Sequence, residues 1–230
     1  MRLSLDPIPQ LIIFDTYGTL IDWQSAIVSF IRETLAQKGE NIDADVFYRV
    51  WYYGYALPAV VDKPYRPYRQ LLQHSFQQAL KAHRICVIPS DGEALGDVMA
   101  SALPFPDAIP ALNKLKAKYR LATISNSEDD IIVHAVAKLG QPFDFVITAQ
   151  TTHAYKPSPA LFELVMAKAG VTPAETVHVG QSQYVDLPCS IPMGMRTIWI
   201  NRQGQQLLKE TPVPHVELRD LVQLPEFLAA

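Results

Sequence analysis

Residues 11–20 read Leu-Ile-Ile-Phe-Asp-Thr-Tyr-Gly-Thr-Leu, and this stretch decides the fold. A wholly apolar run ends on the carboxylate of Asp15, and a glycine turn follows at Gly18. In a parallel α/β protein this pattern predicts a buried strand that carries Asp15 to the C-terminal edge of the sheet, where ligands bind. Burying a bare carboxylate costs free energy unless the group is needed. We therefore interpret Asp15 as a functional residue rather than as a turn or helix-capping aspartate.

The composition predicts a globular protein that acts on small molecules. Of its 230 residues, 49% are hydrophobic and 19% charged, which is too apolar for a disordered chain. The net charge of −3 gives no reason to expect nucleic acid or an anionic membrane as a partner. Cys86 and Cys189 are far apart, so we expect neither a disulfide framework nor a zinc site, and a reducing cytoplasmic setting. No apolar run reaches membrane-spanning length.

Residues 22–99 are predicted to be an all-helical insert, because no strand pattern occurs there. Three stretches show helical spacing of their apolar residues: 24–38, 45–55 and 68–83. The prolines at 58, 64 and 67 predict a break between the second and third of these helices. The apolar residues expected on the surface of this insert are compatible with a homodimer.

From Pro104 onward the pattern changes to alternating strands and helices. Strands are predicted at 121–125, 143–148, 176–180 and 197–200, and helices at 108–118, 128–139 and 158–169. Such alternation implies parallel strands joined by right-handed crossovers. We therefore predict an α/β protein: a Rossmann-like parallel-sheet core of residues 1–21 and 100–230, with a helical cap at 22–99 inserted into it.

Polar residues follow four apolar runs at the points where the predicted strands end. They are Asp15, Ser125 with Asn126, the loop that holds Lys156, and Gln181 leading to Asp186. Because the C-terminal ends of parallel strands share one edge, these groups should converge. There Asp15 can act as a nucleophile, and Lys156 can offset its charge and that of an anionic substrate. Ser125, Asn126 and backbone N–H groups can hold developing negative charge.

These motifs, in this order, resemble those of the haloacid dehalogenase superfamily, and the helical insert lies where that family has its cap. The motifs are Asp15-Thr-Tyr-Gly-Thr19, Ser125-Asn126, Lys156-Pro157 and Gly180-Gln-Ser-Gln-Tyr-Val-Asp186. The first motif and the ending Trp199-Ile-Asn-Arg202 are similar to the type II, L-2-haloacid dehalogenase-like, branch. The resemblance implies that Asp15 displaces a leaving group, forms an aspartyl ester and is released by water, with Lys156 and Asp186 as the other catalytic residues.

The same resemblance implies a set of substrate-binding residues. They are Thr16, Tyr17, Arg49, Ser125, Asn126 and Gln181. Arg49 is the nearest candidate for the arginine that dehalogenases carry on the first cap helix, and Tyr52 is the alternative at that place. Asp186 has a structural alternative role in holding Lys156, and Ser125-Asn126 can also cap the following helix. Most tyrosines between residues 48 and 68 are expected to pack the cap, with one or two facing the cleft.

Tyr17 and Gln181 argue against the phosphatases of the superfamily. Those enzymes have a second aspartate two residues after the nucleophile, and a phenol with a pKa of about 10 cannot replace it as acid and base near neutral pH. They also have an acid at the position of Gln181, and Mg²⁺ prefers carboxylates, so we predict no obligatory metal or other cofactor. A magnesium-dependent phosphatase remains the alternative. Since dehalogenases have Ser, Asn and Tyr at the positions of Gln181, Gln183 and Phe162, a catalytically silent binding protein is the second alternative.

Overall fold

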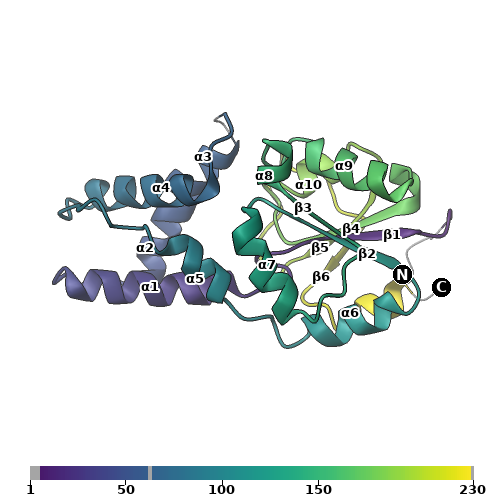
Figure 1. Ribbon diagram of the computed structural model, residues 1–230, viewed down its shortest axis with the longest axis horizontal. Helices are drawn as coiled ribbons and strands as arrows, with labels where there is room; N and C mark the ends of the chain where they lie inside the picture. The colour runs from purple at the N-terminus through teal and green to yellow at the C-terminus, as the bar shows by residue number, and fades with distance from the viewer. Residues whose placement is uncertain (1–5, 62–63, 229–230) are drawn as a thin grey trace.

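The computed structural model describes residues 6–61 and 64–228, so the predicted domain ends at residues 1 and 230 lie outside it. Across these ranges six parallel strands form one sheet in the order β3-β2-β1-β4-β5-β6 (Figure 1). The strands are β1 (Leu11–Asp15), β2 (Arg120–Ser125), β3 (Phe145–Thr148), β4 (Thr176–Gly180), β5 (Arg196–Ile200) and β6 (Val216–Leu218). The predicted α/β class is confirmed.

The apolar run of β1 reflects its place in the middle of the sheet. β1 pairs with β2 on one side and with β4 on the other, and all five of its residues are buried. Ile12 and Phe14 face one apolar layer, whereas Leu11 and Ile13 face the other. A strand covered on both faces needs apolar side chains at successive positions rather than at alternate ones.

Helices cover both faces of the sheet, as Figure 1 shows. On the Ile12 face lie α6 (Ala108–Lys116), α7 (Asp129–Lys138) and α11 (Leu224–Leu228). On the Leu11 face lie α9 (Ala160–Ala169) and α10 (Leu187–Ser190), and the short α8 (Ala149–Thr152) follows β3. In the described ranges, no helix combines the length and the apolar character needed to cross a membrane.

The remaining helices lie together beyond one end of the sheet (Figure 1). They are α1 (Trp23–Gln37), α2 (Ala44–Trp51), the π-helical turn Tyr52–Ala56, α3 (Leu57–Val61), α4 (Tyr68–Ala82) and α5 (Leu95–Ser101). The two chain crossings between these helices and the sheet run side by side, since the Asp22 N–H donates to the Leu103 carbonyl at 2.8 Å. The predicted boundary at residues 99 and 100 falls within α5, so we now place it at this pair of crossings.

Pro58 does not break the helix as predicted. The chain passes from α2 through the π-helical turn into α3, of which Pro58 is the second residue. The Leu57 N–H bonds to the carbonyl of Tyr52, five residues earlier. A proline ring normally clashes with the carbonyl four residues before it, here that of Gly54, and the wider π turn gives the ring room.

Candidate active site

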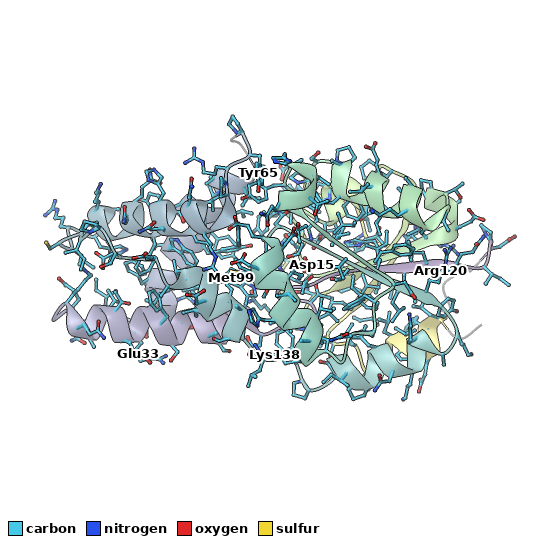
Figure 2. The ribbon with its side chains drawn as sticks, in the orientation of Figure 1. Asp15, Glu33, Tyr65, Met99, Arg120 and Lys138 are labelled. Carbon is cyan, nitrogen blue, oxygen red and sulfur yellow. The ribbon has the colours of Figure 1, made fainter. Side chains whose placement is uncertain are left out.

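The ends of neighbouring strands bring the predicted catalytic residues together. Asp15 is the last residue of β1, Lys156 lies in the loop between α8 and α9, and Asp186 directly precedes α10. Figure 2 shows Asp15 at the end of the sheet near Met99 of α5, with Arg120 at the opposite end. The candidate site therefore lies where the sheet meets the helices of the segment that the sequence predicts to be a cap, residues 22–99.

Lys156 links the two carboxylates. Its Nζ donates to Asp15 Oδ1 and to Asp186 Oδ1, both at 2.7 Å, and the side chain is 1% exposed. Asp15 Oδ2 accepts a hydrogen bond from Thr19 Oγ1 at 2.8 Å. Asp186 Oδ2 accepts one from the Ser182 backbone N–H at 3.1 Å. Each carboxylate is thus fixed at both oxygens, with an ammonium between them.

The surroundings shift the pKa values of the two carboxyls in opposite directions. For Asp15, burial raises the pKa, and so does the charge of Asp186. The ammonium of Lys156 and the hydroxyl of Thr19 lower it but do not outweigh burial, so the pKa of Asp15 lies above its ordinary value. Burial acts on Asp186 in the same direction, but Lys156 and His178 outweigh it and hold its pKa below the usual range. On acidification Asp15 therefore takes up a proton before Asp186 does.

The raised pKa of Asp15 predicts an acid limb in the activity profile. Any reaction in which Asp15 attacks as a carboxylate should slow as the pH falls, with a midpoint above the ordinary aspartate value of about 3.9. The dependence of kcat/KM on pH measures this limb, with circular dichroism at each pH to exclude unfolding. A rate that stays constant down to pH of about 4 would contradict the expectation.

Asn126 fixes the backbone of Lys156. Its Oδ1 accepts from the Lys156 N–H at 2.7 Å, and its Nδ2 donates to the Lys156 carbonyl at 3.1 Å. Ser125 Oγ pairs with Ser127 Oγ at 2.9 Å. The N-cap of α7 is Glu128, without a capping side-chain hydrogen bond in the described structure, so the capping role considered for Ser125-Asn126 is not observed.

Replacing Asn126 with alanine should loosen the loop that carries Lys156. Two hydrogen bonds to a part-buried backbone are lost, which is expected to lower the free energy of unfolding by about 1–3 kcal/mol. Misplacing the ammonium should also lower kcat by about 10-fold to 100-fold. Denaturant unfolding and steady-state kinetics measure the two effects, with the exposed Asn41→Ala as a matched control. An unchanged kcat would show that Asn126 does not position Lys156 for the reaction.

A small cavity lies above Asp15 and Lys156. Its volume is about 60 Å³, a few times the roughly 10–15 Å³ that one water needs. The lining residues are Asp15, Tyr17, Trp23, Tyr52, Ala56, Leu57, Val60, Tyr68, Leu71, Met99, Ser125, Asn126, Lys156, Gln181, Ser182 and Val185. The walls are thus mostly aromatic and aliphatic side chains of the helices within residues 23–101, together with Tyr17 and Val185, whereas the polar groups come from the strand ends.

Two of the predicted substrate-binding side chains do not line this cavity. The Thr16 hydroxyl is buried in the sheet, 2.7 Å from Thr123 Oγ1. Arg49 is exposed on α2 and is not among the described residues around the cavity. Helix α2 buries Tyr48 and neighbouring apolar residues. A step of one residue turns a helix by about 100°, so the Arg49 side chain points away from the direction of Tyr48. Tyr52, the alternative, does line the cavity.

Two of the tyrosines between residues 48 and 68 line the cavity, Tyr52 and Tyr68, as expected. Two residues that contact the carboxylates were not singled out from the sequence: Thr19 donates to Asp15, and His178 Nε2 lies 3.4 Å from Asp186 Oδ1. A threonine in a turn gives no specific signal. A histidine inside a buried strand is most simply interpreted as a core residue, and only the folded sheet shows what it contacts.

Known proteins share the sequence pattern of this chain. A family model for haloacid dehalogenase-like hydrolases matches residues 9–189. The chain belongs to this family. The (S)-2-haloacid dehalogenase 4A of Burkholderia cepacia is 30% identical over 84% of this chain and 83% of that protein. The (S)-2-haloacid dehalogenase H-109 of Pseudomonas putida is 25% identical, over 94% and 96% of the two chains.

Solved structures show the same fold. The L-2-haloacid dehalogenase of Xanthobacter autotrophicus with chloropropionic acid covalently bound superimposes with a TM-score of 0.82 at 21% identity, covering 96% of this chain and 99% of that one. A dehalogenase with an intermediate complex gives a TM-score of 0.83 at 25% identity, covering 97% and 98%. The resemblance of the motifs to the type II branch is therefore confirmed.

The residues of this hydrolase do not fit a magnesium site of the kind expected for the family's phosphatases. The Lys156 ammonium already lies within 2.7 Å of both carboxylates, where it would repel a divalent cation. Gln181, at the cavity wall, is neutral. Among the residues that the structure describes, no group of three or more His, Cys, Asp or Glu side chains is arranged to hold a metal.

Proposed function

We propose that this hydrolase is a 2-haloacid dehalogenase that works without a metal. The observation that carries the proposal is the Lys156 ammonium between Asp15 and Asp186, at the floor of a small and mostly apolar cavity. An ionised carboxylate at this position is a nucleophile held in place by hydrogen bonds. The named relatives in Burkholderia cepacia and Pseudomonas putida, both (S)-2-haloacid dehalogenases, support the same activity.

The reaction proceeds through an ester. An oxygen of Asp15 attacks the halogen-bearing carbon of the acid, and the halide leaves with the bonding electron pair. Water then adds to the carboxyl carbon of Asp15, and the bond from that carbon to the ester oxygen breaks. The products are the 2-hydroxy acid, the free Asp15 carboxylate and one proton, which leaves to the solvent, while Asp186 holds Lys156 in place through its Oδ1. Lys156 is the cation that stabilises the charge on Asp15 in the first and last states.

The leaving group favours this reaction over phosphate ester hydrolysis. A halide departs as a stable anion, whereas an alcohol needs a proton from a general acid. At the position of that acid stands Tyr17, whose hydroxyl donates to the Ile131 carbonyl at 3.3 Å. Burial raises the pKa of Tyr17 further above its ordinary value. No observation at this site favours the phosphatase alternative.

The cavity favours a small anionic substrate. A volume of about 60 Å³ is small for a ligand pocket and favours a compact substrate. The Ser125 and Asn126 side chains and turn N–H groups are the proposed holders of its carboxylate. The free cysteines Cys86 and Cys189 agree with the proposed cytoplasmic location. Nucleic acid and membranes are not proposed partners, and a homodimer remains a prediction.

A substrate panel tests the proposal. The purified protein is assayed with chloroacetate, bromoacetate, each enantiomer of 2-chloropropionate and an aryl phosphate, with and without Mg²⁺ and with a chelator. We expect halide release that is independent of Mg²⁺ and unaffected by the chelator. Phosphate release that requires Mg²⁺, without halide release, would replace the proposal with the phosphatase alternative. The absence of turnover on either class would favour the silent binding protein.

A further inference from the structure

His178 is a buried titratable residue that the proposed reaction does not yet use. It lies within β4, fully buried, opposite Ile13 in the register of β1 and β4. Its Nδ1 is 3.1 Å from the Ile13 carbonyl oxygen. Because a carbonyl oxygen only accepts, Nδ1 carries a proton and donates it. Nε2 then faces Asp186 Oδ1 at 3.4 Å and has no hydrogen-bond partner among the described residues.

The surrounding residues leave room for this imidazole beside Asp186. A Cβ at Gly180 would lie 2.7 Å from His178 Nε2 and 2.7 Å from Asp186 Oδ2, so a larger residue there would displace one or both groups. The Phe162 ring packs edge-on against the imidazole, with ring centroids 4.9 Å apart and planes at 81°. Phe162 stands where the resemblance leads us to expect a tyrosine, and it offers no hydroxyl to this cluster.

The geometry is unfavourable for a neutral imidazole. With Nδ1 protonated, the neutral ring would direct the lone pair of Nε2 toward an ionised carboxylate at 3.4 Å in a buried site. A proton on Nε2 turns this repulsion into an attraction. The net charge of the neighbouring groups also favours a protonated imidazole. Asp15 and Asp186 together carry two negative charges, and Lys156 supplies only one positive charge.

We propose that His178 carries a proton on Nε2 and acts as a positioning residue, the second cation that balances Asp186 beneath Lys156. The cluster is then neutral before substrate enters, so an anionic substrate meets no net repulsion in the cavity. Once Asp15 has become an ester, the two cations outnumber Asp186, which stabilises the bound anions. This kinetic role rests on the proposed function, whereas the position of the proton does not.

The other charged groups around His178 do not replace it. Lys156 Nζ contacts the same oxygen as His178 Nε2, Asp186 Oδ1, at 2.7 Å, but it is shared with Asp15 Oδ1 at 2.7 Å and so balances only one of the two carboxylate charges. On α10, burial raises the pKa of the Cys189 thiol to about 11, so this group stays neutral. On α9, the neighbour of Phe162 is Glu163, which is exposed and therefore screened by solvent.

Nitrogen NMR of the imidazole tests the position of the proton. The protein is labelled with ¹⁵N-histidine, and the His178→Gln variant identifies the signals of this ring. At the pH of maximal activity, or at neutral pH if no activity is found, we expect both nitrogens of His178 to have the shifts of protonated N–H groups. An Nε2 signal typical of a bare lone pair would overturn the proposal. The test needs no turnover, so it can succeed or fail independently of the proposed dehalogenase activity.

Kinetics provides the second readout. Glutamine keeps an N–H donor near the place of Nε2 but removes the charge, so His178→Gln should raise KM for an anionic haloacid by about tenfold or more. The matched control is His83→Gln at the end of α4, where another Nε2 has no partner in the described structure. A purely structural role would lower the fraction of folded enzyme and leave KM unchanged, and that result would overturn the proposed charge balance.

Discussion

Replacing Asp15 with asparagine should abolish halide release, with kcat reduced by at least about 10³-fold. The amide has the size of the carboxylate and can still contact Thr19 and Lys156, but it lacks the negative charge that displaces the halide. Halide release and circular dichroism on the purified variant separate lost chemistry from lost folding. The exposed Asp45→Asn is the matched control and should retain full activity. Substantial halide release by Asp15→Asn would exclude Asp15 as the nucleophile.

An oxygen label distinguishes an ester from direct attack by water. With enzyme in excess over a haloacid in heavy-oxygen water, one turnover should leave the heavy atom in the Asp15 carboxylate, because water attacks its carboxyl carbon. Mass spectrometry of the peptide that contains Asp15 measures the incorporation. The hydroxyl oxygen of the first product molecule should be unlabelled. Label that appears only in the product would mean that water attacks the substrate directly.

The sheet, and the edge of it that carries Asp15, could be predicted because local patterns of apolar and polar residues determine them. The apolar run before Asp15 requires a strand covered on both faces, and β1 is the strand of this kind in the middle of the sheet. Asn126 and Lys156 follow other strands, and parallel strands place their C-terminal ends together. Short elements such as β6 (Val216–Leu218) have too few residues to show a period, and they were not predicted.

Other features depend on contacts that a single sequence does not display. The outward position of Arg49 depends on the exact phase of α2, and the helical continuation at Pro58 depends on the π turn before it. The pairing of His178 with Asp186 requires the β1–β4 register and the small size of Gly180.

Gln183 shows how a departure from the dehalogenase pattern can have a local structural cause. Its Nε2 donates to Gln205 Oε1 at 3.0 Å, and its Oε1 accepts from the Leu208 N–H at 2.8 Å. The side chain therefore holds the segment after β5 instead of facing the cavity. Asp15 and Lys156 are unaffected by this departure, since the Gln183 side chain bonds to Gln205, Gln206 and Leu208 in the described structure.

Replacing Lys156 with methionine should abolish activity and also destabilise the fold. The change leaves Asp15 and Asp186 buried without the ammonium between them. Removing one partner of a buried ion pair is expected to cost about 3–5 kcal/mol at neutral pH. Denaturant unfolding measures the loss, and the exposed Lys168→Met should change the free energy of unfolding by no more than about 0.5 kcal/mol. A loss as small as that of the control would mean that the cluster does not depend on this charge.

The pH dependence of this variant should have the opposite sign to the contribution that Asp186 makes in the wild type. In the wild type, the lowered pKa of Asp186 contributes stability that is present above the unfolded value of about 3.9 and is lost as the pH falls through the folded value. Without Lys156, nothing cationic offsets burial and the charge of Asp186, so the pKa of Asp15 lies further above its unfolded value and its ionisation opposes folding. The stability of Lys156→Met should therefore increase between pH 7 and about 5, over which the wild-type contribution of Asp186 stays constant. Adding Asp15→Asn to Lys156→Met should recover part of the lost stability at pH 7, because one unpaired buried charge is removed.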